Sequence, residues 1–263
     1  MSNGQPPSRQ RDAARVSQAR HYSYQLYADP AMAESFDARR FSGPIGRLLA
    51  ETQERVIASF LAPLEGLQVL DVGTGTGRAA IALALRGACV TGVDASDEML
   101  AVGRRRAGDA KVDVHFLKGD AHALEFATRS FDVAISLRVL MHTPDWRRSL
   151  AELCRVAGQN VVFDYPSLAS AAALQSAVRH LANAAGARTE AYRVFSDRSI
   201  RAALRANGFT VARSHRQFVL PIALHKRIGS ATATTRVERA LRHAGLNWLL
   251  GSPVTVLAER CAS

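Results

Sequence analysis

The chain has few cysteines and no long apolar run. Its three cysteines are odd in number, far apart and without metal-ligand spacing: Cys89, Cys154 and Cys261. We therefore expect reduced thiols in packing roles rather than a disulfide framework. No window of about 18 uncharged apolar residues occurs, and no charged start leads into an apolar segment near Met1. The sequence thus predicts neither a transmembrane helix nor a secretory signal, and we expect a cytoplasmic protein.

Lysine is also scarce, since Lys111, Lys118 and Lys226 are the only lysines among 34 basic residues. The formal net charge of +11 is of the kind that attracts nucleic acids, anionic membranes or acidic substrates. The arginines are scattered, however, and the one run of three, Arg104 to Arg106, is typical of a solvated helix face. A codon-biased genome would produce the same skew, so the charge alone does not indicate a partner.

Apolar runs and helical periodicities alternate along the middle of the chain. The expected strands are Gln68–Val72, Ala88–Val93, Val112–Leu117, Phe131–Ser136 and Asn160–Asp164, and the expected helices include 76–85, 97–106 and 145–156. This βαβ order predicts an α/β fold with a doubly wound parallel sheet. Helices broken at Pro30 and near Ser42 precede the first strand. Two further strands at 209–220 and 253–260 flank an expected helix at 235–249.

A glycine loop follows the first strand, in the stretch VLDVGTGTGRAA from Val69 to Ala80. Glycines between a strand and a helix let the backbone turn tightly and approach a ligand. A dinucleotide site favours G-x-G-x-x-G, but Arg78 occupies the third glycine position here. Asp71 precedes the loop, where it would repel a pyrophosphate and attract an ammonium group, by about 4 kcal/mol at 4 Å before desolvation. S-adenosylmethionine carries such a group.

Carboxylates also follow the next two strands. Asp94 lies about 20 residues beyond the loop, where it can accept hydrogen bonds from both hydroxyls of a ribose. Asp120 follows the third strand and can accept one from an adenine amino group. An alternative is structural: Ser96 or Asp97 would cap the next helix, and Met99 would only fill the core. His142 follows the fourth strand, where it would act as a general base or shape the pocket.

These motifs together resemble the class I S-adenosylmethionine-dependent methyltransferases, in particular the small-molecule group that includes the ubiquinone and menaquinone enzymes. The likeness covers residues 68–166, with VLDVGTGTG, VDASDEML, GDA, FDVAISLRVLMH and ELCRVAGQNVVF in order. It implies a Rossmann-like, mostly parallel seven-stranded sheet. The turn before the fifth strand, Arg155 to Gly158, is shorter than is usual in the family, which weakens assignment to a subfamily.

The resemblance also implies a set of residues that bind S-adenosyl-L-methionine. The methionine part would lie against Asp71, Gly73, Thr74, Gly75 and Gly77. Ribose and adenine would lie near Asp94, Ala95, Met99, Asp120 and Ala121, with Leu137 and Arg138 lining the floor. A planar guanidinium suits bidentate contact with a carboxylate, so we expect Arg40 to pair with the carboxylate of the cofactor.

In this interpretation the chain has a polar tail followed by one methyltransferase domain over 16–263. The tail covers 1–15. The domain then consists of an N-terminal helical cap (16–60), a cofactor-binding core (61–166), a helical lid insert (167–195) and the C-terminal part of the sheet (196–263). The cap and the lid insert would cover the acceptor.

The expected reaction is methyl transfer to a small organic acceptor by direct in-line displacement. No metal is expected, because H-x-x-x-H and C-x-x-C are missing. The residues after the fourth strand, SLRVLMH, do not favour a nucleobase target. The apolar-then-basic segment 218–227 suggests a quinone-like or lipidic acceptor near an anionic membrane. The alternatives are a non-catalytic S-adenosylmethionine-binding protein and a dinucleotide-dependent oxidoreductase. The sequence carries no signal for the attacked atom or the oligomeric state.

Overall fold

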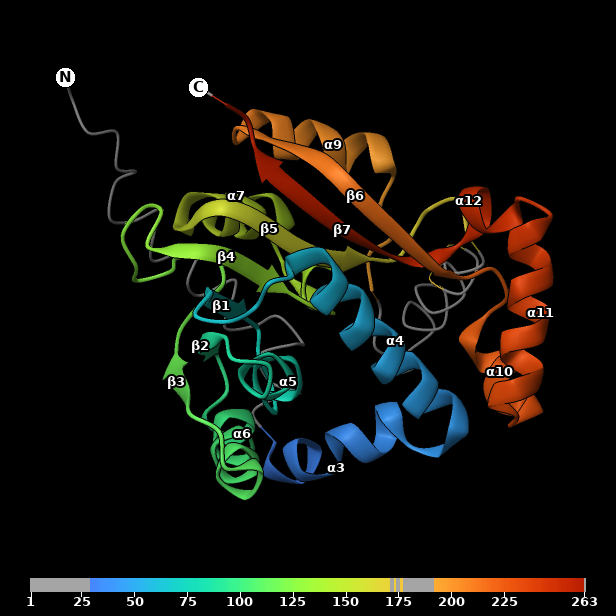
Figure 1. Ribbon diagram of the computed structural model, residues 1–263, viewed down its shortest axis with the longest axis horizontal. Coiled ribbons are helices and arrows are strands. Elements are labelled where there is room, and N and C mark those ends of the chain that lie inside the picture. The colour runs from blue at the N-terminus through green and yellow to red at the C-terminus, as the bar shows by residue number, and fades with distance from the viewer. Residues whose placement is uncertain (1–28, 171–172, 174–175, 177–191, 263) are drawn as a thin grey trace, which may run out of the picture.

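Seven strands form a single sheet in the computed structural model, which describes residues 29–170, 173, 176 and 192–262 (Figure 1). The spatial order is β3-β2-β1-β4-β5-β7-β6. Neighbours from β3 to β5 run parallel, and β7 runs antiparallel to both β5 and β6. The predicted doubly wound, mostly parallel sheet is therefore confirmed. The strands are β1 Gln68–Val72, β2 Cys89–Asp94, β3 Val114–Lys118, β4 Phe131–Ser136, β5 Ala157–Tyr165, β6 Phe209–Phe218 and β7 Ser252–Arg260.

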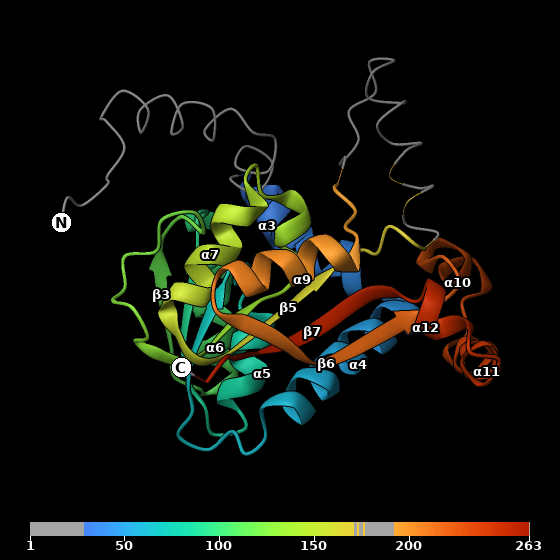
Figure 2. The same ribbon diagram turned by 90° about the horizontal axis from the view of Figure 1, so that it is seen from above.

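Helices cover both faces of the sheet because successive strand residues point to opposite sides. Leu70 and Phe163 pack towards α7 (Trp146–Val156) and α9 (Asp197–Ala206). Their neighbours Val69 and Val162 pack towards α4 (Gly43–Leu61) and α5 (Arg78–Ala84). Figure 2 shows the result from above, with α7 and α9 on one side of β5 and β7, and with α4 on the other. Both faces are buried, so most side chains of the central strands are apolar, and the acids Asp71 and Asp164 lie at or near strand ends.

The N-terminal helices lie at the edge that carries the glycine loop. Helix α3 (Pro30–Phe41) packs against α6 (Asp97–Ala110) and joins α4 at Ser42. The predicted helix break near Ser42 is confirmed, and Gly43 takes the positive φ of 71° that the turn requires. Figure 1 shows α3 between α6 and the start of α4.

The C-terminal region differs from the single helix predicted at 235–249. Three helices occur, α10 (Ile222–Ile228), α11 (Ala231–His243) and α12 (Leu246–Leu250). Gly229 ends α10 with φ 70°, and Gly245 precedes α12 with φ 78°. Glycine at a helix end adopts this left-handed conformation without a steric penalty. The prediction was wrong because it continued one helical pattern through Gly245 and assigned no helix to the residues between 220 and 235.

Helix α7 ends at Val156 and β5 begins at Ala157, so the turn before the fifth strand has no loop residue. Among the cysteines, only Cys154 is buried, whereas Cys89 and Cys261 are exposed, so the expected packing role holds for Cys154 alone. The predicted tail and most of the predicted lid insert lie outside the described residues. Within the described part, no helix is both long and apolar enough to cross a membrane.

Candidate active site

The glycine loop connects β1 to α5 at the carboxyl ends of the strands. The backbone N–H groups of Gly73 and Thr74 donate to the Val93 carbonyl at 2.7 and 3.0 Å, which ties the loop to β2. Gly75 has φ 57°, and a Cβ at this position would meet no atom within 4 Å. The loop therefore presents bare backbone to an open space. Gly77 is different, because its Cβ would lie 2.7 Å from the Phe116 ring, so it permits close packing of the loop on β3.

Asp71 is a buried carboxylate at the base of this loop, with 2% of its surface exposed. The Thr74 hydroxyl donates to it at 2.8 Å. Burial raises the pKa of Asp71 to about 6, against the lowering effects of the Thr74 hydrogen bond and the Arg78 charge. A cation placed beside this carboxylate would offset the cost of burying its negative charge.

Asp94 ends β2 and faces the same loop. Its Oδ2 accepts the Gly75 N–H at 2.8 Å, and its Oδ1 accepts the Ser96 N–H at 3.0 Å. Burial raises the pKa of Asp94, and these backbone donors oppose the rise. Each oxygen keeps a second lone pair, so the side chain can still accept two hydroxyl groups. Ser96 caps α6 by accepting the Met99 N–H at 3.0 Å, so the helix-capping interpretation holds together with the pocket.

Asp120 lies apart from the pocket that its neighbours line. Its Oδ1 accepts the His122 backbone N–H at 2.9 Å and lies 2.7 Å from His122 Nδ1. His122 is buried, and the Asp145 N–H points to its Nε2 at 3.4 Å, where α7 is about to start. The Asp120–His122 pair thus connects the end of β3 to the start of α7. Ala121, between the two, lines the pocket.

The loop after β4 closes the other side of the pocket. Arg138 has a positive φ of 63°, and its backbone N–H donates to Asp164 Oδ1 at 2.5 Å. His142, in the short 3₁₀ helix η1 (Leu140–His142), is 7% exposed and lines the same pocket. Since a non-glycine residue rarely adopts this φ, the Asp164 bond holds the loop in its conformation.

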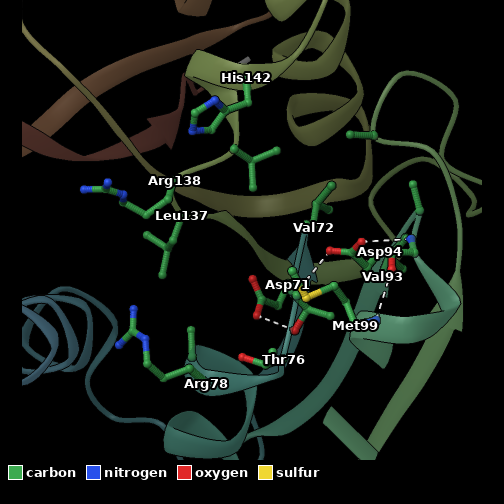
Figure 3. A pocket seen from close by; sticks show the side chains of 18 of the residues that line it. Asp71, Val72, Thr76, Arg78, Val93, Asp94, Met99, Leu137, Arg138 and His142 are labelled. Atoms are coloured by element: carbon green, nitrogen blue, oxygen red, sulfur yellow. Dashed lines mark hydrogen bonds between the residues drawn. The ribbon is translucent and has the colours of Figure 1, made fainter. Parts of the chain in front are cut away.

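One pocket unites nearly all the residues singled out from the sequence. It encloses about 1170 Å³, part of it open to solvent, and Gly77 and Asp120 are the two predicted residues that do not line it. Figure 3 shows the side chains of Asp71, Asp94 and Met99 together, with Arg78, Arg138 and His142 towards the other end. The pocket thus has an acidic end and a basic end. The predicted residues lining it are Arg40, Asp71, Gly73, Thr74, Gly75, Asp94, Ala95, Met99, Ala121, Leu137, Arg138 and His142.

Helix α3 is attached to the glycine loop by a hydrogen-bonded cluster. The Thr76 hydroxyl donates to the Asp37 carboxylate at 3.1 Å, and Arg106 of α6 binds both Asp37 and the Thr76 carbonyl, the latter at 3.2 Å. Arg105 pairs with Glu34 at 2.8 Å. Arg104 and Arg105 are exposed, as expected for a solvated helix face, whereas Arg106 is half-buried by its contacts with α3 and the glycine loop.

Two pocket-side residues escaped the sequence analysis, Gln53 and Asp164. The Gln53 amide donates to Asp164 Oδ2 at 3.1 Å, and its oxygen accepts from Arg78. Arg78 also pairs with Glu54 at 3.0 Å and lies over the Phe41 ring at 4.5 Å. Burial raises the pKa of Asp164, and the nearby Arg138 and Arg78 charges oppose this. Asp164 follows the same strand-end pattern as Asp71 and Asp94, but nothing local marks Gln53.

No three His, Cys, Asp or Glu side chains are grouped to hold a metal ion within the part of the chain that the structure describes. The expectation of a metal-free reaction stays a prediction.

Comparison with known proteins shows which family the central part of the chain resembles. Residues 69–160 match the family model described as a methyltransferase domain. The fold is similar to magnesium protoporphyrin IX methyltransferase from Synechocystis PCC 6803 with bound SAH, at a TM-score of 0.61 and 20% identity over 82% of this chain and 85% of that one. The family match over residues 69–160 and the sheet order support the resemblance of this chain to the class I S-adenosylmethionine-dependent methyltransferases.

Several curated relatives of the chain are methyltransferases. The chain is 43% identical over 97 residues to demethylmenaquinone methyltransferase of Clavibacter sepedonicus, covering 36% of this chain and 39% of the relative. It is 40% identical over 87 residues to ubiquinone biosynthesis O-methyltransferase of Paramagnetospirillum magneticum, covering 33% and 34%. The chain thus spans less than half the length of these two relatives.

Proposed function

We propose that this chain binds S-adenosylmethionine in the pocket along the ends of β1, β2 and β4, and transfers its methyl group to a small organic acceptor. The observation that carries the proposal is the pairing of buried Asp71 with the open backbone at Gly75, in a pocket that Asp94 also lines. An anionic dinucleotide phosphate would be repelled by this carboxylate, whereas an ammonium group would be attracted.

The residues present fit this cofactor. Asp71 would hold the ammonium group, and the two remaining lone pairs of Asp94 would accept the ribose hydroxyls. Arg40 would bind the methionine carboxylate. Ala95, Met99 and Ala121 would surround the adenine, and Asp120 would position this edge through His122.

The chemistry that S-adenosylmethionine supplies is a methyl group on a sulfonium, which a lone pair of the acceptor displaces in line. The protein orients the acceptor and excludes water. His142 is placed in the lining to take a proton from an acceptor hydroxyl. The guanidinium groups of Arg78 and Arg138, at the basic end of the pocket, would stabilise negative charge on the acceptor oxygen.

The proposed acceptor is quinone-like or lipidic. Phe36, Phe41, Leu137 and Val139 give the pocket an apolar lining around the basic end. An aromatic acceptor with a phenolic hydroxyl would satisfy both the apolar lining and the basic groups. The names of the two quinone-pathway relatives agree with this chemistry.

Calorimetry with S-adenosylmethionine tests the binding step. We expect Asp94→Ala to weaken binding at least tenfold, because two hydrogen bonds to a charged group are lost. Asp113→Ala, at an exposed carboxylate before β3, is the matched control and should bind as the unmodified chain does. No measurable binding by the unmodified chain, or equal binding by Asp94→Ala, would contradict the proposal.

A transfer assay tests the catalytic step. The methyl group of the cofactor is labelled, and phenols, quinones, amines and lipids are screened as acceptors. We expect label in a phenolic or quinone-like compound. Binding of S-adenosylmethionine without transfer to any class would favour the non-catalytic alternative.

A further inference from the structure

The helices α10 to α12 carry an unusual share of the exposed apolar surface. Eight large apolar side chains are exposed among the described residues, and six of them lie within residues 222–250. Trp248 is 80% exposed and Leu249 is 55% exposed. Contiguous exposed apolar groups on a soluble domain generally mark an interaction site. The six are Leu224, Ile228, Val237, Leu246, Trp248 and Leu249, and we call residues 222–250 the α10–α12 surface.

The same segment is strongly basic. It holds five arginines and lysines: Lys226, Arg227, Arg236, Arg239 and Arg242. Its one acidic residue, Glu238, is 3% exposed. The Glu238 carboxylate accepts the backbone N–H groups of Val219 and Leu220 at 2.8 and 3.0 Å and lies 2.8 Å from His225 Nε2. All the charge that this surface shows to solvent is therefore positive.

A groove beside α11 concentrates this charge. Arg55 of α4, Arg239 and Arg242 of α11, and His215 of β6 line it, together with the buried Glu238, whose carboxylate is taken up by the backbone and His225 contacts described above. Burial lowers the pKa of His215, and the charges of Arg242 and Arg55 lower it further. Guanidinium groups from two elements thus converge on His215, whose Nε2 is buried without a hydrogen-bond partner. Guanidinium and hydroxyl groups are the donors that phosphate oxygens prefer.

We propose that the α10–α12 surface docks the protein on anionic phospholipid membranes, with the exposed apolar side chains among the headgroups and the basic groove against lipid phosphates. Amphipathic helices with basic and aromatic residues bind such surfaces through both contributions. Figure 1 shows α10 and α11 at one margin of the molecule, beside the start of α4, so the sheet does not obstruct a flat surface there.

The docking surface lies next to the cap of the pocket. Lys226 Nζ donates to the Arg40 carbonyl at 3.4 Å, and Arg40 lines the pocket. If the chain transfers methyl groups as proposed, docking would place the pocket beside membrane-dissolved acceptors. Membrane binding itself needs neither the cofactor nor turnover, so the two proposals fail independently.

Tryptophan fluorescence offers a direct readout, because the chain has two tryptophans and Trp146 is only 6% exposed. Vesicles of equal parts phosphatidylcholine and phosphatidylglycerol are added to the full chain at low salt, without S-adenosylmethionine. We expect a blue shift of the emission, quenching by brominated lipid, and co-flotation of the protein. Trp248→Phe should lose the shift and keep most of the flotation.

Substitutions on α11 test the charge contribution. We expect the combined variant Arg236→Gln, Arg239→Gln, Arg242→Gln to bind these vesicles about a hundredfold more weakly, since each basic residue near the surface contributes a factor of about five. The matched control loses the same charge from exposed positions elsewhere, Arg86→Gln, Arg147→Gln, Arg198→Gln, and should bind as before. Thermal unfolding shows that both variants are folded.

Three results would overturn the proposal. One is no flotation with anionic vesicles. Another is equal binding to pure phosphatidylcholine, or an equal loss in the control variant. The third is a blue shift that grows with protein concentration in the absence of vesicles, which would assign the surface to contact between copies of this chain.

Discussion

Asp71 is deeply buried, and a cation bound beside it would stabilise its ionised form. Its pKa is raised to about 6 by burial, so the ligand-free protein holds a proton there that the unfolded chain would release near pH 4. Its contribution to stability is therefore greatest at acid pH and declines as the pH rises through 6. Binding of an ammonium group lowers the pKa of Asp71 again, because the positive charge favours the ionised carboxylate.

From this follows a pH dependence of cofactor binding. We expect the affinity for S-adenosylmethionine to be constant above pH 7 and to fall about tenfold per unit below pH 6, because a proton must then leave Asp71. Calorimetry between pH 5 and pH 8 measures it. Asp71→Asn should bind weakly at every pH and lose the slope. A slope that persists in Asp71→Asn would assign the titration to another group, such as His142.

At the scale of elements, α3 is held by apolar packing of Ala33 on α6 and by a few polar contacts. Thr76, in the glycine loop, and Arg106, on α6, both bind Asp37 on α3. These polar contacts tie α3 directly to the loop that we propose to hold the cofactor. A substitution that disturbs α3 should therefore also disturb the glycine loop, and the reverse.

The matched pair Arg106→Gln and Arg105→Gln tests this connection. Neither residue lines the pocket. We expect Arg106→Gln to weaken S-adenosylmethionine binding about threefold to tenfold and to speed proteolysis within α3, because a partly buried charged hydrogen bond is lost. Arg105→Gln removes an exposed ion pair with Glu34, which is worth little in water, and should change neither quantity. Identical behaviour of the two variants would show that α3 is held otherwise.

At the scale of the whole molecule, the pocket lies at one end of the sheet. The elements at the far edge of the sheet do not contact it. The described pocket lining comes from α3, the first residues of α5 and α6, and the ends of β1 to β4 with their loops, whereas β6, β7 and α11 contribute none. Ligand binding should therefore stabilise the protein globally while changing local motion at one end.

We expect S-adenosylmethionine at a hundred times its dissociation constant to raise the free energy of unfolding by about 2.7 kcal/mol and the melting temperature by about 5–10 °C. Hydrogen exchange should slow at the glycine loop and in α3, with α11 unchanged. Thermal scans and exchange measured by mass spectrometry check both. At the same ligand concentration, Asp94→Ala should reduce the stabilisation to about 1.4 kcal/mol or less, in line with an affinity at least tenfold weaker. Uniform protection that includes α11 would contradict this placement of the site.

The sequence by itself determined the alternation of strands and helices, the glycine loop and the acids Asp71 and Asp94. These features are local, since strand burial, turn chemistry and strand-end position are written within a few residues. The signals that end or start helices at Gly229 and Gly245 are equally local, but the prediction of a single helix did not use them.

Only the tertiary structure decided which distant residues meet. It inserts β7 between β5 and β6, joins Gln53 to Asp164 across 111 positions, and buries Glu238 under the ends of β6 and α10. It also separates Asp120 from the pocket and closes α3 over Arg106. Such contacts depend on how whole elements pack, and packing energy is shared among many side chains, so no short stretch of sequence encodes them.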